Sequence, residues 1–196
     1  MKKTGLFFGS FNPVHIGHLI IANHIVEHSG LDEVWLVVTP HNPHKKKKTL
    51  LNDYQRLMMV RLATEAYPKL HASNIEFDLP QPNYTINTLA FLQEKYPDRE
   101  FVLLMGQDNL AGFKKWKNYE VILKYYRLFV YPRITTKEVP EELINHPAVT
   151  MIKAPVIELS ATQIRKDIAA GKNVRPLLPP EVFQYIDEMN FYRSKN

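Results

Sequence analysis

The stretch Gly9-Ser10-Phe11-Asn12-Pro13-Val14-His15-Ile16-Gly17-His18 decides how this sequence is interpreted. It follows a short apolar run at residues 4–8 and leads into a helical pattern over 14–29 that stops at Gly30. Strand, tight loop and helix in this order are typical of the first unit of a parallel α/β sheet. Ligands bind such sheets at the carboxyl ends of the strands, so the sequence predicts a site in this loop.

The same alternation of apolar strands and helices continues along the chain, punctuated by proline and glycine. Further strands are predicted at 34–38, 70–77, 101–105, 128–131 and 149–152, and helices at 52–67, 84–96, 118–126, 161–170 and 181–189. Residues 131–148 are predicted to be irregular, and Ser160 with Gln163 predicts a capping box. We therefore expect a Rossmann-like, doubly wound parallel sheet with helices on both faces. We expect one domain over 1–196, with core βαβ units in 1–135 and C-terminal helices in 150–196.

Composition narrows the class of protein. The 25 Lys and Arg exceed the 20 Asp and Glu by five, and four of the cations stand together at 45–48, which suits anionic small molecules better than an extended nucleic-acid interface. The absence of cysteine excludes disulfide scaffolds, thiolate zinc sites and cysteine nucleophiles. The amino-terminal apolar run is too short for a signal sequence and no apolar stretch reaches 18 residues, so we expect a soluble, cytoplasmic protein without a membrane partner.

The residues of the first loop suit phosphate binding. Gly9 lets a ligand approach the backbone, while His15 and His18, three positions apart at a helix start, project to one side beside free N–H groups and the positive end of the helix dipole. The loop is neither the dinucleotide fingerprint G-x-G-x-x-G nor the P-loop G-x-x-x-x-G-K-[ST]. The sequence thus predicts a phosphate site with two imidazole donors.

Residues 9–18 resemble the G-x-F-x-P-x-H-x-G-H signature of the nucleotidyltransferase superfamily, and residues 159–165 resemble its second element at a late helix start. Residues 39–45, residues 83–89 and the Gly106-x-Asp108 stretch with Trp116 are similar to segments of the bacterial nicotinate-nucleotide adenylyltransferases. The resemblance spans nearly the whole chain. It departs from the family pattern at Asn12 and Asn87, where Asp is commoner, and at Lys117, where an aromatic residue often stands.

The resemblance implies an enzyme of NAD biosynthesis that joins nicotinate mononucleotide to ATP, giving nicotinate adenine dinucleotide and pyrophosphate. It implies Mg²⁺ bound with ATP, held mostly by phosphate and water, and no metal site built by the protein. A preference for the acid over the amide mononucleotide is expected, because a carboxylate accepts two backbone donors where an amide would present NH₂ to one of them.

The resemblance also implies the residues of the site. The groups expected to stabilise the transferred phosphate are His15, His18 and Arg165. Those expected to bind ATP are Gly9, Ser10, Phe11, His15, His18, Gly106, Asp108, Ser160, Thr162 and Arg165. Those expected to bind the mononucleotide are His44, Lys45, Thr85, Trp116 and Lys117.

Other interpretations stay open at this stage. His15 and His18 with His41 and His44 could form a four-histidine metal site, Trp116 could be a core residue, and Asp108 could be a helix cap. The acceptor could be pantetheine phosphate or nicotinamide mononucleotide, and the nucleotide could be CTP. From a different class, the lysines at 45–48 could serve a nucleic-acid-binding module. An aminoacyl-tRNA synthetase is disfavoured by the length of the chain, and a homo-oligomer is left open.

Overall fold

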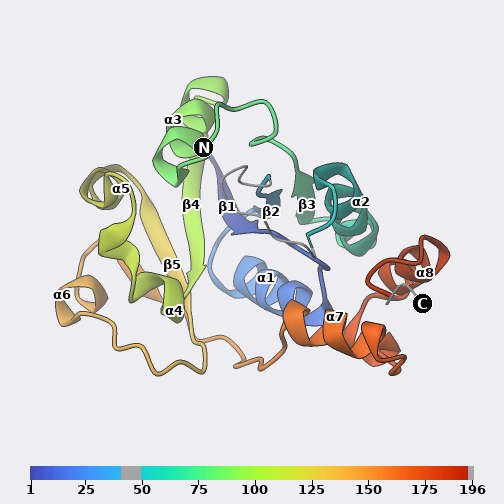
Figure 1. The fold of residues 1–196 in the computed structure, drawn as a ribbon. Coiled ribbons are helices and arrows are strands. Elements are labelled where there is room, and N and C mark those ends of the chain that lie inside the picture. The colour runs from blue at the N-terminus through green and yellow to red at the C-terminus, as the bar shows by residue number, and fades with distance from the viewer. Residues whose placement is uncertain (41–49, 194–196) are drawn as a thin grey trace.

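The computed structural model describes residues 1–40 and 50–193 (Figure 1). Its centre is one six-stranded sheet in the order β3-β2-β1-β4-β5-β6, with every neighbouring pair parallel. The strands are β1 (Lys2–Gly9), β2 (Glu33–Val38), β3 (Leu70–Ser73), β4 (Arg99–Gly106), β5 (Arg127–Tyr131) and β6 (Val149–Met151). The predicted doubly wound fold is confirmed.

The helices form two groups, one on each side of the strands in Figure 1. The first group is α1 (Ile16–His28), α2 (Asp53–Thr64), α7 (Ala161–Ala169) and α8 (Pro180–Glu188). The second is α3 (Thr85–Lys95), α4 (Gln107–Leu110), α5 (Tyr119–Tyr125) and α6 (Glu141–Ile144), and the short 3-10 turns η1 (Phe113–Lys115) and η2 (Arg175–Leu177) complete the elements.

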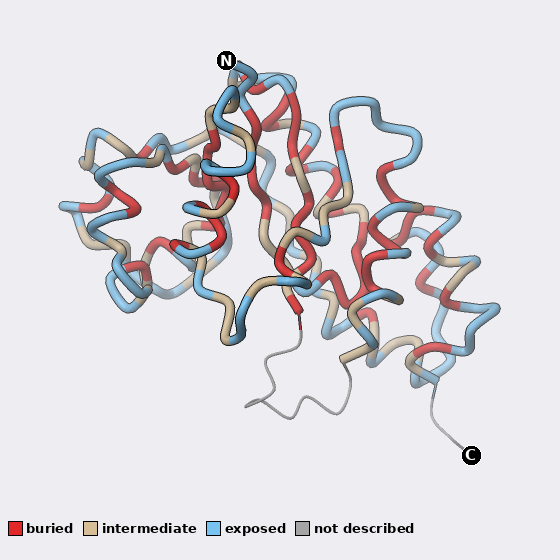
Figure 2. Tube along the Cα trace, turned by 90° about the horizontal axis from the view of Figure 1, so that it is seen from above, coloured by how far each residue is buried: buried red, intermediate tan, exposed pale blue. Residues whose placement is uncertain are grey.

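The two groups exist because successive strand residues point to opposite faces of a sheet. Leu6 and Leu103 belong to the core under α3 and α5, whereas their chain neighbours Phe7 and Leu104 belong to the core under α1 and α2. Both faces of the central strands are therefore apolar and buried, as Figure 2 shows by the red tube through the middle of the molecule.

The position of β1 in the sheet places the site. The chain runs from β1 through β2 to β3 on one side, then crosses back to β4 on the other side of β1, so the strand order reverses between β1 and β4. Crevices at such a reversal, outside the carboxyl ends of the strands, are where open α/β sheets bind ligands. Gly9 ends β1 and Gly106 ends β4, so the loops that follow both strands open into this crevice.

The structure corrects several sequence predictions. The strand predicted at 70–77 ends at Ser73, the helix predicted to reach 67 ends at Thr64, and the region predicted to be irregular contains α6. The predicted capping box at Ser160 is wrong: α7 begins at Ala161, but the Ser160 side chain makes no capping hydrogen bond. Gln163 has a competing partner one turn further on, donating from Nε2 to Asp167 Oδ1 at 3.0 Å. In residues 1–40 and 50–193, no helix is both long and apolar enough to cross a bilayer.

Candidate active site

The two histidines of the first loop lie face to face. His15 precedes α1, His18 lies in its first turn, and their rings stack with centroids 3.7 Å apart. The backbone N–H of His15 donates to Nδ1 of His18 at 3.2 Å. Because Nδ1 accepts, the proton of the neutral His18 ring sits on Nε2. His18 therefore offers one fixed N–H donor.

Both imidazoles are uncharged near neutral pH. Burial, with the nearby Arg133 guanidinium, lowers the pKa of His15 to about 4. Burial, then His15 and Arg133, lowers the pKa of His18 well below its ordinary value. Neutral donors beside a permanent cation can hold a polyanion without gaining or losing a proton themselves.

Residues from later in the chain line the cleft at His15 and His18. The cleft at the histidines is lined on the far side by Ile157 and Leu159, from the segment that leads into α7, and by Arg133 after β5. The sequence analysis missed Arg133. The signal that could have found it is its place: a basic residue directly after a strand that ends at the ligand-binding edge.

Arg165 of α7 reaches the first loop. Its Nη1 donates to the backbone oxygen of Asn12 at 2.7 Å, and its Nη2 donates to Oγ1 of Thr162 at 3.3 Å. Its Nε is buried and has no hydrogen-bond partner among the residues that the structure describes. The early and late motifs therefore meet at the first loop, and one donor of Arg165 is left for a ligand.

The glycines of the site leave room for side chains. At Gly106 a Cβ atom would lie 2.5 Å from Oδ1 of Asp108 and 2.7 Å from Cδ of Arg133, so any side chain here would displace these two groups from their present positions. Asp108 and Arg133 form an ion pair, Oδ1 to Nε, at 3.7 Å. Asp108 lies within α4 and does not cap it. At Gly9 the space is filled by the Phe11 ring, 2.9 Å from where a Cβ would stand, so Gly9 also serves packing.

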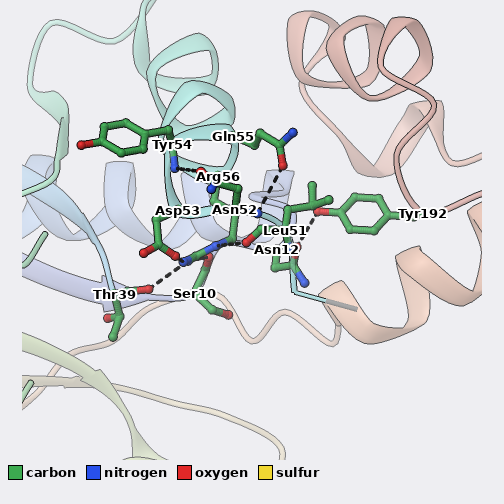
Figure 3. Close-up of polar contacts among 10 residues, drawn as sticks. All are labelled: Ser10, Asn12, Thr39, Leu51, Asn52, Asp53, Tyr54, Gln55, Arg56 and Tyr192. Carbon is green, nitrogen blue, oxygen red and sulfur yellow. Dashed lines mark hydrogen bonds and ion pairs between the residues drawn. The ribbon is translucent and has the colours of Figure 1, made fainter. Parts of the chain in front are cut away.

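A buried arginine is hydrogen-bonded to the first loop (Figure 3). Arg56 of α2 is fully buried, and its Nη1 donates to the backbone oxygens of Ser10 at 2.6 Å and Thr39 at 2.9 Å. Its Nε donates to the oxygen of Leu51 at 3.1 Å, and its Nη2 pairs with Asp53. The sequence analysis did not single out Arg56. One guanidinium joins the ends of β1 and β2 and the start of α2.

The residues expected to bind the acceptor lie at the opposite flank. Thr85 is the first residue of α3, and Lys117 reaches this helix end by placing Nζ 4.3 Å from the centroid of the Tyr84 ring. Trp116 is half-buried and packs on Phe113, with ring centroids 5.2 Å apart. His44 and Lys45 lie outside the described residues.

Metal ligands are sparse at this edge. Nowhere in residues 1–40 and 50–193 do three His, Asp or Glu side chains gather in a way that could hold a metal ion. The four-histidine alternative stays untested, because His41 and His44 lie outside the described residues.

The chain is similar to known proteins along nearly its whole length. The model of a family described as cytidylyltransferase-like matches residues 6–167. A protein of Flavobacterium psychrophilum described as a "probable nicotinate-nucleotide adenylyltransferase" is 62% identical over 98% of this chain and 100% of its own. A Bacteroides fragilis protein with the same description is 46% identical over 94% of this chain and 90% of its own.

Solved structures share the fold. The nicotinic acid mononucleotide adenylyltransferase of Plasmodium falciparum, solved in complex with NaAD, aligns with a TM-score of 0.80 over 98% of both chains at 18% identity. The same enzyme in complex with APC aligns with the same score. At this identity the likeness shows the fold alone.

Proposed function

Because this chain belongs to the cytidylyltransferase-like family and, within it, to the nicotinate-nucleotide adenylyltransferases, we propose that its site transfers the adenylyl group of ATP to nicotinate mononucleotide. The products are nicotinate adenine dinucleotide and pyrophosphate. The observation that carries the proposal is the hydrogen bond from Arg165 to Asn12, which brings the late helix to the histidine loop at the carboxyl edge of the sheet.

The reaction needs no protein nucleophile. A phosphate oxygen of the mononucleotide attacks the α-phosphorus of ATP, and the bond from that phosphorus to the bridging oxygen of pyrophosphate breaks. Two anions must be aligned and the charge on the reacting phosphate offset, so positioning and electrostatics supply most of the acceleration.

We assign these tasks to the donors that converge on the first loop. The fixed Nε2–H of His18 and the guanidinium of Arg165 face the reacting phosphate, with His15 stacked behind His18. The Ser160 hydroxyl, which makes no bond to its own helix, is available to the triphosphate. Arg133 adds a fixed positive charge beside the imidazoles. Asp108, which is paired with Arg133 in this structure, is assigned to accept a hydrogen bond from a ribose hydroxyl of ATP in place of that ion pair.

The acceptor is assigned to the other flank. We place its pyridine ring against Trp116 and its carboxylate on the backbone N–H groups near Thr85 and Lys117. The Lys117 side chain already lies over the ring of Tyr84, the residue before Thr85. His44 and Lys45 are assigned to its phosphate, as expected from the sequence.

A nucleotidyltransferase that uses ATP works with a divalent metal, and we propose Mg²⁺. Among the described residues, no group of three His, Asp or Glu side chains could hold the ion, and Asp108 is already paired with Arg133. The metal would therefore bind together with the triphosphate and be held by phosphate oxygens and water. Its chemistry is to neutralise charge on the leaving pyrophosphate. ATP and a mononucleotide are substrates of the cell interior, so the cytoplasmic location stays a prediction consistent with the proposal.

One assay tests the proposal. The purified protein is incubated with ATP and Mg²⁺ and either nicotinate or nicotinamide mononucleotide, and dinucleotide and pyrophosphate are quantified by chromatography. We expect equimolar products, with the acid mononucleotide favoured in kcat/KM. No dinucleotide from either mononucleotide would refute adenylyl transfer to a pyridine nucleotide. Parallel reactions with pantetheine phosphate and with CTP test the related transferases, and DNA binding at 0.1 M salt tests the nucleic-acid alternative.

A further inference from the structure

Asn12 is a junction between four distant segments. Its backbone oxygen accepts from Arg165 at 2.7 Å, while its side-chain Oδ1 accepts from the backbone N–H of Leu51 at 3.3 Å and from the hydroxyl of Tyr192 at 2.7 Å. Figure 3 shows Tyr192 pointing at Asn12 from the end of the chain. Asn12 itself is 3% exposed and lies in the middle of the histidine loop. A contact that holds Asn12 in place therefore also holds the backbone oxygen to which Arg165 donates.

The backbone after α8 directs the Tyr192 hydroxyl toward Asn12. Asn190, with φ 52°, follows the end of α8 in the left-handed conformation that commonly terminates a helix, and the N–H of the buried Phe191 donates to the oxygen of Ile186 at 3.0 Å. Tyr192, with φ 63°, adopts a backbone conformation that is uncommon for a tyrosine. The end of α8 thus turns the chain so that the Tyr192 hydroxyl reaches Asn12.

The Tyr192 hydroxyl is a permanent donor. Burial raises the pKa of this phenol, and the smaller opposing effects of Arg165 and Arg56 do not reverse the direction. The hydroxyl therefore stays protonated at neutral pH, and it has one acceptor in the described structure, Oδ1 of Asn12. The side chain of Asn12 is an uncharged amide, so it does not draw the Arg165 guanidinium away from the backbone oxygen of Asn12.

We infer that Tyr192 is a positioning residue of the adenylyl-transfer site, which acts through Asn12 to hold Arg165 and the histidine loop in register for ATP. The Tyr192 hydroxyl is engaged with Asn12, so the inferred role is to position the loop and not to bind the substrate. The inference rests on the proposed function. It adds that the end of the chain completes a site whose motifs lie at residues 9–18 and 159–165.

The test is Tyr192→Phe, which keeps the ring and removes the hydroxyl. With wild-type protein active, kcat/KM for ATP should fall about three- to tenfold, the range that corresponds to one hydrogen bond, while KM for the mononucleotide stays unchanged. The matched control is Tyr185→Phe, a half-buried tyrosine of α8 whose hydroxyl makes no hydrogen bond to the described residues of the loop, and it should match wild type. Each variant is assayed well below its own melting temperature.

A mutant cycle separates positioning from general stability. In an Asn12→Ala background, which lacks the acceptor, Tyr192→Phe should have no further effect, whereas in Asn12→Asp, which keeps it, the loss should persist. Wild-type kcat/KM for ATP in Tyr192→Phe, or losses that multiply with Asn12→Ala, would overturn the inference. Absence of dinucleotide formation by the wild-type protein would instead overturn the proposed function.

Discussion

Arg56 is the residue on which the geometry of the first loop depends most directly. Replacing it with methionine keeps a long side chain in the same space but removes every donor. The backbone oxygens of Ser10, Thr39 and Leu51 then lose their partner, and Asp53 loses its cation. The change therefore breaks a buried network on one side only.

The cost follows from those contacts. A buried acceptor left without its donor costs about 1–3 kcal/mol, and breaking a buried charged pair from one side costs about 3–5 kcal/mol. Ser10 is exposed, and Thr39, Leu51 and Asp53, whose side chain is 28% exposed, can also regain water, so we expect less than the sum of these costs, close to the cost of the broken charged pair alone. Arg56→Met should lose about 3–5 kcal/mol of unfolding free energy, a large share of the ~5–15 kcal/mol of a typical domain.

Urea unfolding followed by circular dichroism measures this loss. Arg61→Met, an exposed arginine on the same helix, is the matched control and should lie within about 0.5 kcal/mol of wild type. In Arg56→Met we also expect adenylyl transfer to drop at temperatures where the variant is still folded, because Ser10 and Thr39 are no longer tied together. If Arg56→Met were as stable as Arg61→Met, the network would not hold the loop and this reasoning would fail.

Three further predictions address the site. His18→Ala should lower kcat at least about 10²-fold, as for loss of one preorganised donor, whereas exposed His28→Ala should not; equal rates would remove the assigned role. The lowered pKa of His15 means that between about pH 6.5 and 4 the unfolded chain binds a proton that the folded one does not. His15 alone should thus lower stability by about 3 kcal/mol as pH drops through that window. His15→Gln should reduce but not abolish the slope of unfolding free energy against pH, because the pKa of His18 is lowered as well; an unchanged slope would contradict the assignment. Gly106→Ala should raise KM for ATP several-fold with little loss of stability, since its added Cβ displaces Asp108 and Arg133 while the backbone there suits any residue; a wild-type KM would show that the pair can shift freely.

The fold can be predicted from the sequence because the residues that end its strands and helices are local signals. Glycine and proline stand close to the ends of most strands and helices, and a parallel sheet with two covered faces follows from the apolar runs alone. The errors arise where the signal is weakest. The run at 70–77 is apolar enough for a strand, but only four residues pair with β2, and the chain then turns.

Residues of the candidate site can be predicted from the sequence where reactive residue types occur together in a recognisable motif. His15, His18 and Arg165 stand at helix starts in recognisable spacing, and the structure brings them to one edge of the sheet. Arg56 and Tyr192 carry no such signal. Their partners lie up to 180 residues away, and no local period encodes a contact of that range.

The failed capping box follows the same logic and bears on mechanism. Ser160 and Gln163 have the spacing of a cap, but that spacing only permits the bond, and Asp167 at i+4 competes for the Gln163 amide. A helix start whose serine is not engaged in capping keeps both the hydroxyl and the free N–H groups for an outside acceptor. The unpartnered Nε of Arg165 in the next turn of the same helix offers a further donor. That Nε is buried, and a buried donor without an acceptor is costly to a folded protein. A triphosphate bound beside the exposed Ser160 hydroxyl would supply the missing acceptor.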